Sequence, residues 1–268
     1  MTVLITDLDG TLIPLPDEPQ NGEDLMKLSA YLATNQIPLV YCTGRDYHST
    51  HQLPQRFPLP DPEWIICDVG SSLYRRDGAG RFSLVEEYRE QMHQLASAMP
   101  IPVLREKIVQ LGGMIFQEDF HQGEFKLSFY AKAHERDAKA EQINNFLREN
   151  NAPYSLVTSI DPWAKIALID VLPQGVTKGY AIGWLVEHAS WEPQRVIFAG
   201  DSGNDFAALT AGYRAILVGN AERPLASAVT AAHQEAGWEG RLFLAEGRAT
   251  SGVLEGCLWF LNGAEQDA

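Results

Sequence analysis

The sequence lacks the features that mark several common classes of protein. It has three cysteines, Cys42, Cys67 and Cys257, which lie far apart and match no metal-ligand spacing. Cys42 and Cys67 lie in apolar runs, so we predict buried free thiols, as is usual in a reducing compartment. No apolar run approaches the roughly 18 residues of a membrane span, and there is no repeat or low-complexity segment. These absences argue against a disulfide scaffold, a membrane protein and a repeat protein.

Positive charge is also scarce. Lys and Arg total 21 against 35 for Asp and Glu, which gives a net charge of -14. Such a chain repels nucleic acid and anionic lipid, so we expect neither as a partner. The sequence opens on an apolar strand without the basic segment and apolar core of a secretory signal, and we therefore expect a cytoplasmic protein.

The hydrophobic pattern indicates an α/β fold. With 268 residues, 45% of them hydrophobic, the chain is long enough for two domains. Apolar runs at Val3–Ile5, Ile37–Cys42 and Trp64–Cys67 predict buried strands that each end in polar residues, with a leucine-rich helix between the first two. Parallel sheets of this kind bind ligands at the carboxyl ends of their strands.

The middle of the chain differs in pattern. Phe125–Tyr130 alternates apolar and polar residues, a helix with one apolar face follows, and Tyr154–Ile160 and Lys165–Leu172 predict further strands. The α/β pattern then returns with a helix near Lys178 and strands after it. We therefore predict a smaller α+β unit at residues 84–173, inserted between core segments 1–83 and 174–268.

Asp7 and Asp9 follow the first strand and precede a glycine turn. Alternate residues of an extended chain face the same side, so the two carboxylates repel each other unless a cation or a proton lies between them. A cation there would also neutralise a phosphate, and a proton on one carboxyl would make it a general acid. The pair is therefore a candidate catalytic site.

Two further groups could bind phosphate. Thr43, Gly44 and Arg45 follow the second strand, where a hydroxyl and free backbone N–H groups form a natural phosphate cradle. Arg45 adds a charge that could pair with phosphate or with a carboxylate. Lys178 lies at a predicted helix start, a position that the helix dipole disfavours for a cation unless an anion compensates it. Read alone, an ordinary turn and a solvated surface lysine remain open for these groups.

Asp201 and Asp205 flank Ser-Gly-Asn after a later strand. Asp205 falls one helical turn after Asp201, on the same side. Carboxylate ligands of this kind suit a hard cation that keeps several waters, which indicates magnesium.

Together these clusters resemble the haloacid dehalogenase (HAD) superfamily of phosphatases. They are Asp-Leu-Asp-Gly-Thr from Asp7, Thr-Gly-Arg from Thr43, the isolated Lys178, and Gly-Asp-Ser-Gly-Asn-Asp ending at Asp205. The insertion between the second and third clusters is similar to that superfamily's second cap class. Within it the chain resembles the sucrose-phosphate phosphatase family nearly end to end, through segments such as Phe125–Tyr130 and Ala249-Thr-Ser-Gly-Val-Leu-Glu-Gly. It departs from that family's usual pattern at Gly10 and Asp46.

The resemblance implies a Rossmann-like core, an α+β cap and an aspartyl-phosphate mechanism. It implies that Asp7 attacks phosphorus and that Asp9 is the general acid and base. Magnesium would lie on the carboxylates of Asp7 and Asp201 and on the main-chain carbonyl of Asp9. Outside these ligands, Asp205 and Asn204 would support the site, and the transferring phosphoryl group would be held by the residues Thr43, Gly44 and Lys178.

Other residues keep two interpretations each. In the cap, Gln117, Lys126 and Asp170 could meet sugar hydroxyls or face solvent. Trp163 could stack on a sugar but is better explained by packing, and Asn220 could touch substrate or close a turn. His48 and His51 are three apart on a predicted helix, and without a third ligand a surface pair explains them better than a metal site.

Three functions follow from these interpretations. The first is a phosphatase for a sugar phosphate, with sucrose 6-phosphate favoured. The second is a phosphatase for another glycoside or hexose phosphate, such as a glucosyl- or mannosyl-glycerate phosphate. The third is a non-catalytic, phosphosugar-sensing partner of a glycosyltransferase, which the intact carboxylates disfavour. We expect a monomer, with a sugar-phosphate synthase as the candidate partner protein.

Overall fold

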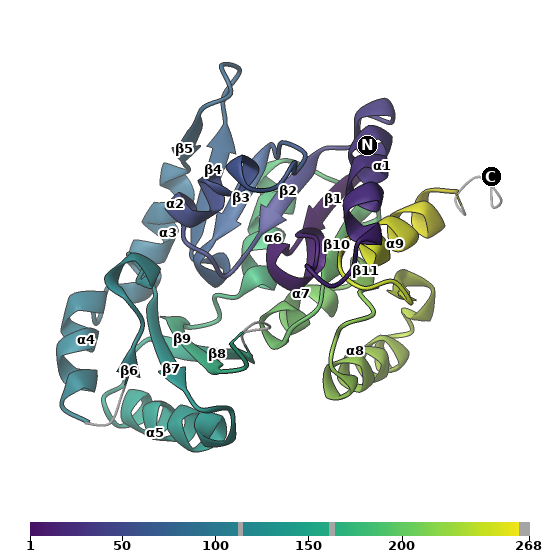
Figure 1. Cartoon of the computed structure of the whole chain (residues 1–268). Helices are drawn as coiled ribbons and strands as arrows, with labels where there is room; N and C mark the ends of the chain where they lie inside the picture. The colour runs from purple at the N-terminus through teal and green to yellow at the C-terminus, as the bar shows by residue number, and fades with distance from the viewer. Residues whose placement is uncertain (112–114, 161–163, 263–268) are drawn as a thin grey trace.

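Two β-sheets carry the architecture (Figure 1). The structure, a computed structural model, describes residues 1–111, 115–160 and 164–262. Within these residues one sheet has eight strands and the other has four. The arrangement confirms the predicted α/β class, a parallel-rich sheet accompanied by a smaller α+β unit. No helix in the described ranges is long and apolar enough to cross a membrane.

The large sheet has the strand order β12-β11-β10-β1-β2-β3-β4-β5. Its strands are β1 Val3–Thr6, β2 Leu39–Cys42, β3 Trp64–Cys67, β4 Ser72–Arg76, β5 Phe82–Leu84, β10 Val196–Gly200, β11 Arg214–Leu217 and β12 Leu242–Leu244. The strands from β12 to β3 run parallel, whereas β4 and β5 are antiparallel additions at one edge. Because β1 pairs with both β2 and β10, the strand order switches there, which is where such sheets bind ligands.

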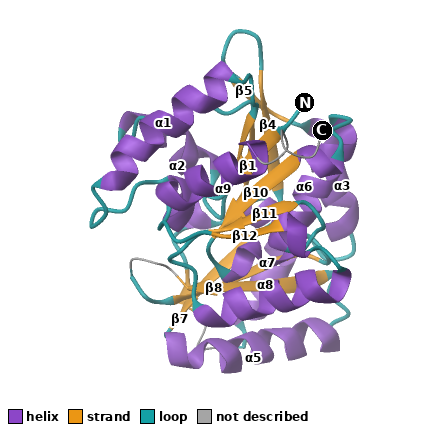
Figure 2. Ribbon diagram, turned by 90° about the vertical axis from the view of Figure 1, so that its right-hand side faces the viewer, coloured by secondary structure: helices purple, strands orange, loops and turns teal. Residues whose placement is uncertain are grey.

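Helices cover both faces of the large sheet (Figure 2). On one face, α1 Gln20–Thr34 and α9 Thr250–Asn262 pack against residues such as Leu4. On the other face, Val3 and Ile5 pack in a second cluster. Helices that contribute to this cluster beside the large sheet include α3 Glu86–Ala96, α6 Lys178–His188, α7 Phe206–Leu209 and α8 Arg223–Ala236. The short helix α2, Tyr47–His51, follows the loop after β2. The all-apolar strands of the sequence are therefore buried on both sides.

The small sheet is antiparallel, in the order β6-β7-β9-β8. Its strands are β6 Ile115–Phe116, β7 Leu127–Ala131, β8 Tyr154–Ile160 and β9 Ala167–Pro173, and its helices are α4 Ile101–Val109 and α5 Arg136–Glu149. Alternation along β7 separates two faces: Leu127 and Phe129 join the apolar cluster of α4 and α5, and Ser128, paired in register with Asp170, hydrogen-bonds to it. One face is thus polar, as the alternating sequence predicts.

The small sheet lies wholly inside the segment predicted as the inserted cap, residues 84–173, whose bounds stay a prediction. The apolar cluster of the small sheet is continuous with the one that includes Val3 and Ile5 of the large sheet. Cys42 and Cys67 are buried free thiols, as predicted, and Cys257 is a buried free thiol as well.

Sequence reasoning missed the strands at the edges of the large sheet. β4 reads Ser-Leu-Tyr-Arg-Arg and is only partly buried, and β5 and β12 have three residues each. The partly exposed β4 and the three-residue edge strands β5 and β12 therefore lack the continuous apolar run that identifies a buried central strand. The predicted central strands agree with the structure to within about two residues, the usual uncertainty of an element boundary.

The central packing predicts a clear stability difference between two phenylalanines. Phe198 on β10 has no exposed surface, whereas Phe120 is 64% exposed. Phe198→Ala should lower the free energy of unfolding by about 3–5 kcal/mol because it opens a cavity in the core. Phe120→Ala is the matched control and should change it by less than about 0.5 kcal/mol. Urea unfolding followed by circular dichroism measures both, and similar losses for the two variants would contradict this packing.

Candidate active site

The predicted clusters meet at the carboxyl ends of the central strands. Asp7 follows β1, Thr43 follows β2 and Asp201 follows β10, while Lys178 is the first residue of α6. The adjacent pairing of β1 with β2 and β10 brings these strand ends together. Residues separated by 190 positions in the chain are thereby in contact, as the hydrogen bond from Thr11 Oγ1 to Asp201 Oδ1 (3.0 Å) shows.

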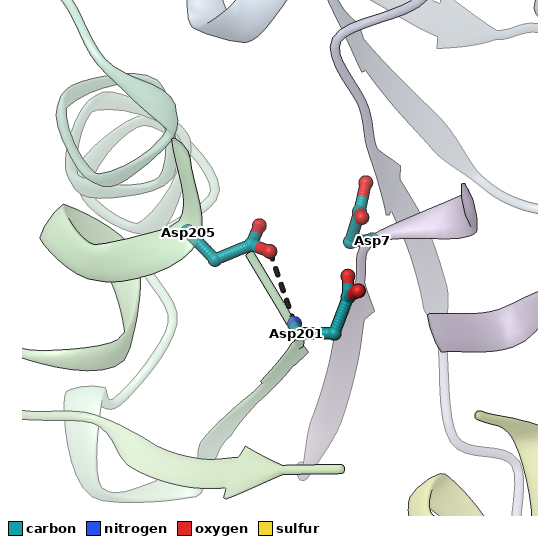
Figure 3. Close-up of side chains that lie close together, drawn as sticks. All are labelled: Asp7, Asp201 and Asp205. Atoms are coloured by element: carbon teal, nitrogen blue, oxygen red, sulfur yellow. Dashed lines mark hydrogen bonds between the residues drawn. The ribbon is translucent and has the colours of Figure 1, made fainter. Parts of the chain in front are cut away.

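Three carboxylates form a buried cluster. Asp7, Asp201 and Asp205 each offer an oxygen within 4.8 Å of the others, and they are 4%, 8% and 0% exposed. Figure 3 shows the three side chains converging, with the Asp205 carboxylate turned to the backbone of Asp201. Three buried carboxylates this close are unstable without compensating positive charge.

Lys178 supplies part of that charge. Its Nζ donates to Asp7 Oδ1 at 2.8 Å and to Asp205 Oδ1 at 2.7 Å, and its side chain has no exposed surface. Burial alone lowers the pKa of Lys178, but Asp205 and Asp7 outweigh it, so the net pKa is raised and the lysine is charged. A solvated surface lysine, the alternative left open by the sequence, is therefore wrong.

The cluster still has more negative than positive charge. Burial, opposed by Lys178, raises the pKa of Asp7 to about 7. Burial, together with the neighbouring Asp7 and Asp205, raises the pKa of Asp201 well above its ordinary value. One lysine cannot balance three carboxylates, and a divalent cation beside Asp7 and Asp201 would. The donor set, all carboxylate oxygen, is the kind that magnesium prefers.

Asp205 acts mainly as a support. Its Oδ2 accepts from the backbone N–H groups of Asp201 (3.1 Å) and Ser202 (2.9 Å), while its Oδ1 accepts from Lys178. Both carboxylate oxygens of Asp205 therefore accept hydrogen bonds from the protein itself. These bonds fix the position of the Asp201 loop and of Lys178 together. Asn204 lies in the same turn, accepts from Ser202 Oγ at 3.1 Å and lines the cavity described below.

The turn after Asp7 is shaped by close contacts. Gly10 has φ +77°, and a Cβ on it would lie 2.5 Å from Asp201 Oδ2, so no larger residue fits without displacing that carboxylate. Asn220 donates to the Gly10 carbonyl at 2.8 Å and accepts from the backbone N–H of Ala249 at 2.7 Å. Asn220 therefore has the turn-closing role rather than a place in the cavity lining.

Asp9 is held by Arg45. Two short hydrogen bonds of 2.6 Å join the guanidinium Nε and NH2 to the carboxylate oxygens. Both side chains are partly exposed, 25% for Asp9 and 33% for Arg45, and both line the cavity. Of the two roles that the sequence allowed for Arg45, pairing with phosphate or with a carboxylate, the structure shows the second.

A cavity of about 220 Å³ lies between the two sheets. The large-sheet side contributes the clusters already described. The opposite wall comes from the polar face of the small sheet and includes all three predicted cap residues, Gln117, Lys126 and Asp170. These three are at most 9% exposed, so they do not face bulk solvent. On this wall, sequence reasoning missed five further lining residues, which are His121, Tyr130, Ser159, Ile160 and Leu168.

A pattern in the sequence could have identified some of the lining residues that were missed. Tyr130 lies two positions after Ser128 on the same polar face of β7, so the alternation that predicted the strand also places it. His121 lies in an irregular segment that carries no such pattern. His48 and His51 lie on α2 outside the cavity, where His48 meets Gln52 at 2.7 Å, in agreement with a helix-surface pair. Trp163 lies outside the described residues.

The family model for sucrose-6F-phosphate phosphohydrolase matches residues 1–261. The mannosylfructose-phosphate phosphatase of Agrobacterium fabrum is 29% identical over 98% of both chains. A protein of Nitrosococcus oceani named as a HAD-like hydrolase is 29% identical over 82% of this chain, and the match spans 59% of that protein. A crystal structure of the sucrose-phosphatase of Synechocystis, in complex with sucrose and phosphate, is 26% identical, covers 97% of both chains and superposes with a TM-score of 0.77.

The family model covers nearly the whole chain, and the carboxylate cluster lies where the motif order predicts it. The chain therefore belongs to the sucrose-6F-phosphate phosphohydrolase family, within the HAD superfamily of phosphatases.

Proposed function

We propose that this protein hydrolyses a sugar phosphate monoester, with Asp7 as the nucleophile and magnesium as the cofactor. The observation that carries the proposal is the position of Asp7. It is buried against Lys178 at one wall of a cavity whose other wall is polar and comes from the small sheet. A phosphate that reaches Asp7 therefore leaves its sugar beside that polar wall.

Magnesium fits the residues present. The carboxylates of Asp7 and Asp201 and the main-chain carbonyl of Asp9 would hold it, and Asp205 and Asn204 would fix the surrounding loop. When bound, magnesium would neutralise charge on the phosphoryl oxygens and relieve the repulsion between the carboxylates. Asp205 is assigned a supporting place because Lys178 and two backbone N–H groups already use its oxygens.

The proposed reaction has two displacements at phosphorus. In the first, a carboxylate oxygen of Asp7 bonds to phosphorus while the bond to the sugar oxygen breaks, and Asp9 gives that oxygen a proton. In the second, Asp9 takes a proton from a water whose oxygen bonds to phosphorus, and the bond to Asp7 breaks. The products are the free sugar and phosphate, and both aspartates return to their starting forms.

Arg45 constrains the proton transfers that this reaction assigns to Asp9. The Arg45 guanidinium occupies both carboxylate oxygens of Asp9. To exchange a proton with the sugar oxygen or with water, Asp9 must be released from Arg45. An incoming phosphate offers the guanidinium an alternative bidentate partner, so we propose that substrate binding itself draws Arg45 away from Asp9.

Phosphate binding is assigned to Thr43, Gly44 and Lys178. Thr43 is 1% exposed and lines the cavity, and its Oγ1 accepts from the backbone N–H of Arg45 at 3.2 Å. The charge of Lys178 lies beside the attacking oxygen of Asp7. Because phosphoryl transfer depends mostly on positioning and charge stabilisation, fixed donors at this point supply most of what the protein must provide.

Sucrose 6-phosphate is the substrate that we favour. The family model and the sucrose-phosphatase structure of Synechocystis support it. Gln117, Lys126 and Asp170 provide donors and acceptors on the wall opposite Asp7, where the sugar hydroxyls would lie. A phosphate of another disaccharide or glycoside is the second candidate. It is favoured by the end-to-end match to mannosylfructose-phosphate phosphatase, and the glucosyl- and mannosyl-glycerate phosphates belong to the same group.

The remaining expectations stay predictions. They are a monomeric state, a cytoplasmic location and contact with a sugar-phosphate synthase. A non-catalytic sensing role is disfavoured because the carboxylates and Lys178 form a connected cluster in the geometry that the reaction needs.

A substrate panel tests the proposed function. We expect wild-type protein with magnesium to hydrolyse sucrose 6-phosphate with a higher kcat/KM than mannosylfructose phosphate, glucosylglycerate phosphate or glucose 6-phosphate. EDTA should remove the activity. Asp7→Asn should abolish turnover with every substrate because an amide cannot form the acyl phosphate. Phosphate release by this variant at more than about a thousandth of the wild-type rate would contradict the nucleophile assignment, since loss of a nucleophile costs several orders of magnitude.

Proton linkage tests the metal site. The pKa of Asp7 is raised in the folded protein from 3.8 to about 7. Without metal, the stability due to its protonated form is therefore full below pH 3.8 and is lost as the pH rises through about 7. Magnesium requires the ionised form, so it should raise the melting temperature more at pH 8 than at pH 6. Differential scanning fluorimetry measures this shift, which Asp201→Ala should remove. Equal magnesium shifts at both pH values would contradict the site.

A further inference from the structure

Residues 68–70 form a left-handed turn after β3. Asp68, Val69 and Gly70 have φ values of +53°, +58° and +105°. The left-handed region is unfavourable for a β-branched residue such as Val69, so the surrounding structure must hold the turn in place. Two backbone hydrogen bonds show what the turn holds: Val69 N–H donates to the Thr43 carbonyl at 3.1 Å, and Asp68 N–H donates to the Arg45 carbonyl at 2.9 Å.

The Gly44 carbonyl, which lies between the Thr43 and Arg45 carbonyls in the chain, accepts a hydrogen bond from a residue of the cap. Lys126 Nζ donates to the Gly44 carbonyl at 3.1 Å. Three consecutive carbonyls of the Thr43–Arg45 loop are therefore fixed, two by the left-handed turn and one by a lysine just before β7. With its carbonyls held in this way, the loop keeps one conformation for the phosphate.

Asp68 fixes Lys126 at this point. Asp68 Oδ1 lies 3.0 Å from Lys126 Nζ, and the two side chains are 7% and 4% exposed. Among the described residues, this oxygen has no partner in a well-formed hydrogen bond, so the lysine charge is what compensates it. Asp68 Oδ2 is occupied by Ser72 Oγ at 3.1 Å. The closeness of the packing is clear at Gly123 of the cap, where a Cβ would lie 3.3 Å from the Asp68 carboxyl carbon and 3.1 Å from Lys126 Cβ.

Lys126 has a competing carboxylate in the cap. Burial lowers the pKa of Lys126, but Asp68 and then Asp170 outweigh it. Asp170 is itself on the cavity wall and accepts from Ser128 Oγ at 2.6 Å. If Asp68 lost its charge, Asp170 would be the stronger remaining attraction for the ammonium group, and Lys126 would move away from the Gly44 carbonyl.

We propose that Asp68 is a positioning residue that holds Lys126 between the phosphate loop and the cap, so that one buried ion pair sets both walls of the site. This inference rests on the proposed function. The Lys126 ammonium group donates to the Gly44 carbonyl and is paired in charge with Asp68, and Lys126 lines the cavity, so a remaining donor is available to a substrate oxygen. A sugar phosphate that spans both walls depends on this placement. A small aryl phosphate contacts the phosphate loop alone, and the two backbone hydrogen bonds from Asp68 and Val69 still hold that loop when Lys126 moves, so it depends on the ion pair much less.

The test uses Asp68→Asn, which keeps the shape of the side chain and tolerates the left-handed conformation but removes the charge. We expect the KM for the best sugar phosphate to rise about ten- to a hundred-fold, the range for a lost hydrogen bond to a charged group, with kcat changed less. The kcat/KM for p-nitrophenyl phosphate should fall less than about three-fold, that is, by under ~0.7 kcal/mol. Ser72→Ala removes the other contact of Asp68 and is the matched control, with both substrates unaffected.

A double-mutant cycle separates positioning from a general effect on folding. If Asp68 acts through Lys126, then Asp68→Asn should add nothing to the KM increase caused by Lys126→Met. Additive effects, equal losses on the sugar and aryl phosphates, or no loss on either would each overturn the proposal.

Hydrogen exchange gives a reading that does not depend on activity. Asp68→Asn should speed amide exchange in peptides that cover residues 43–46 and 123–128, and Ser72→Ala should leave it unchanged. If the wild-type protein hydrolyses p-nitrophenyl phosphate but no sugar phosphate, the proposed substrate class is wrong, and the exchange result alone then decides whether Asp68 holds Lys126. Unchanged exchange in the Asp68→Asn variant would overturn the inference.

Discussion

The buried ion pair of Lys178 with Asp7 and Asp205 is the interaction on which the rest of the site depends. A lysine without exposed surface is stable only if carboxylates surround it, and carboxylates this deep are stable only with a cation beside them. Both requirements are met where the first residue of α6, Lys178, lies against the ends of β1 and β10. A bound divalent cation would balance the negative charge that remains, and the same cation would attract a phosphate.

The two sheets contribute different parts of the site. The large sheet supplies rigid groups at its strand ends, which are the groups that any phosphate monoester needs. The small sheet presents one polar face, and residues such as Gln117 and Asp170 lie where a substrate's remaining atoms would be. A family with this arrangement can keep the reaction and change the substrate by changing the cap. The relatives named for phosphates of different disaccharides are consistent with that division.

The sequence predicted the α/β class and the central strands, because buried parallel strands leave continuous apolar runs with polar residues after them. The meeting of Asp7, Thr43, Lys178 and Asp201 was implied by the family resemblance, since Lys178 read alone also fitted a surface lysine. The sequence could not predict the partly exposed strand β4 or the short edge strands β5 and β12, which lack such runs. It left Arg45 open between phosphate and a carboxylate, since only the folded chain shows its distance to Asp9. The contact of Asp68 with Lys126 joins residues 58 positions apart without any local pattern, so composition and spacing carry no sign of it.

Trapping the acyl phosphate is the most direct test of Asp7 as the nucleophile. Borohydride reduces an aspartyl phosphate to homoserine, so protein quenched with borohydride during turnover of sucrose 6-phosphate can be digested and sequenced by mass spectrometry. We expect homoserine at position 7 and unmodified aspartate at positions 9, 201 and 205. Homoserine at another of these positions, or none during confirmed turnover with a control acyl phosphate reduced in the same mixture, would contradict it.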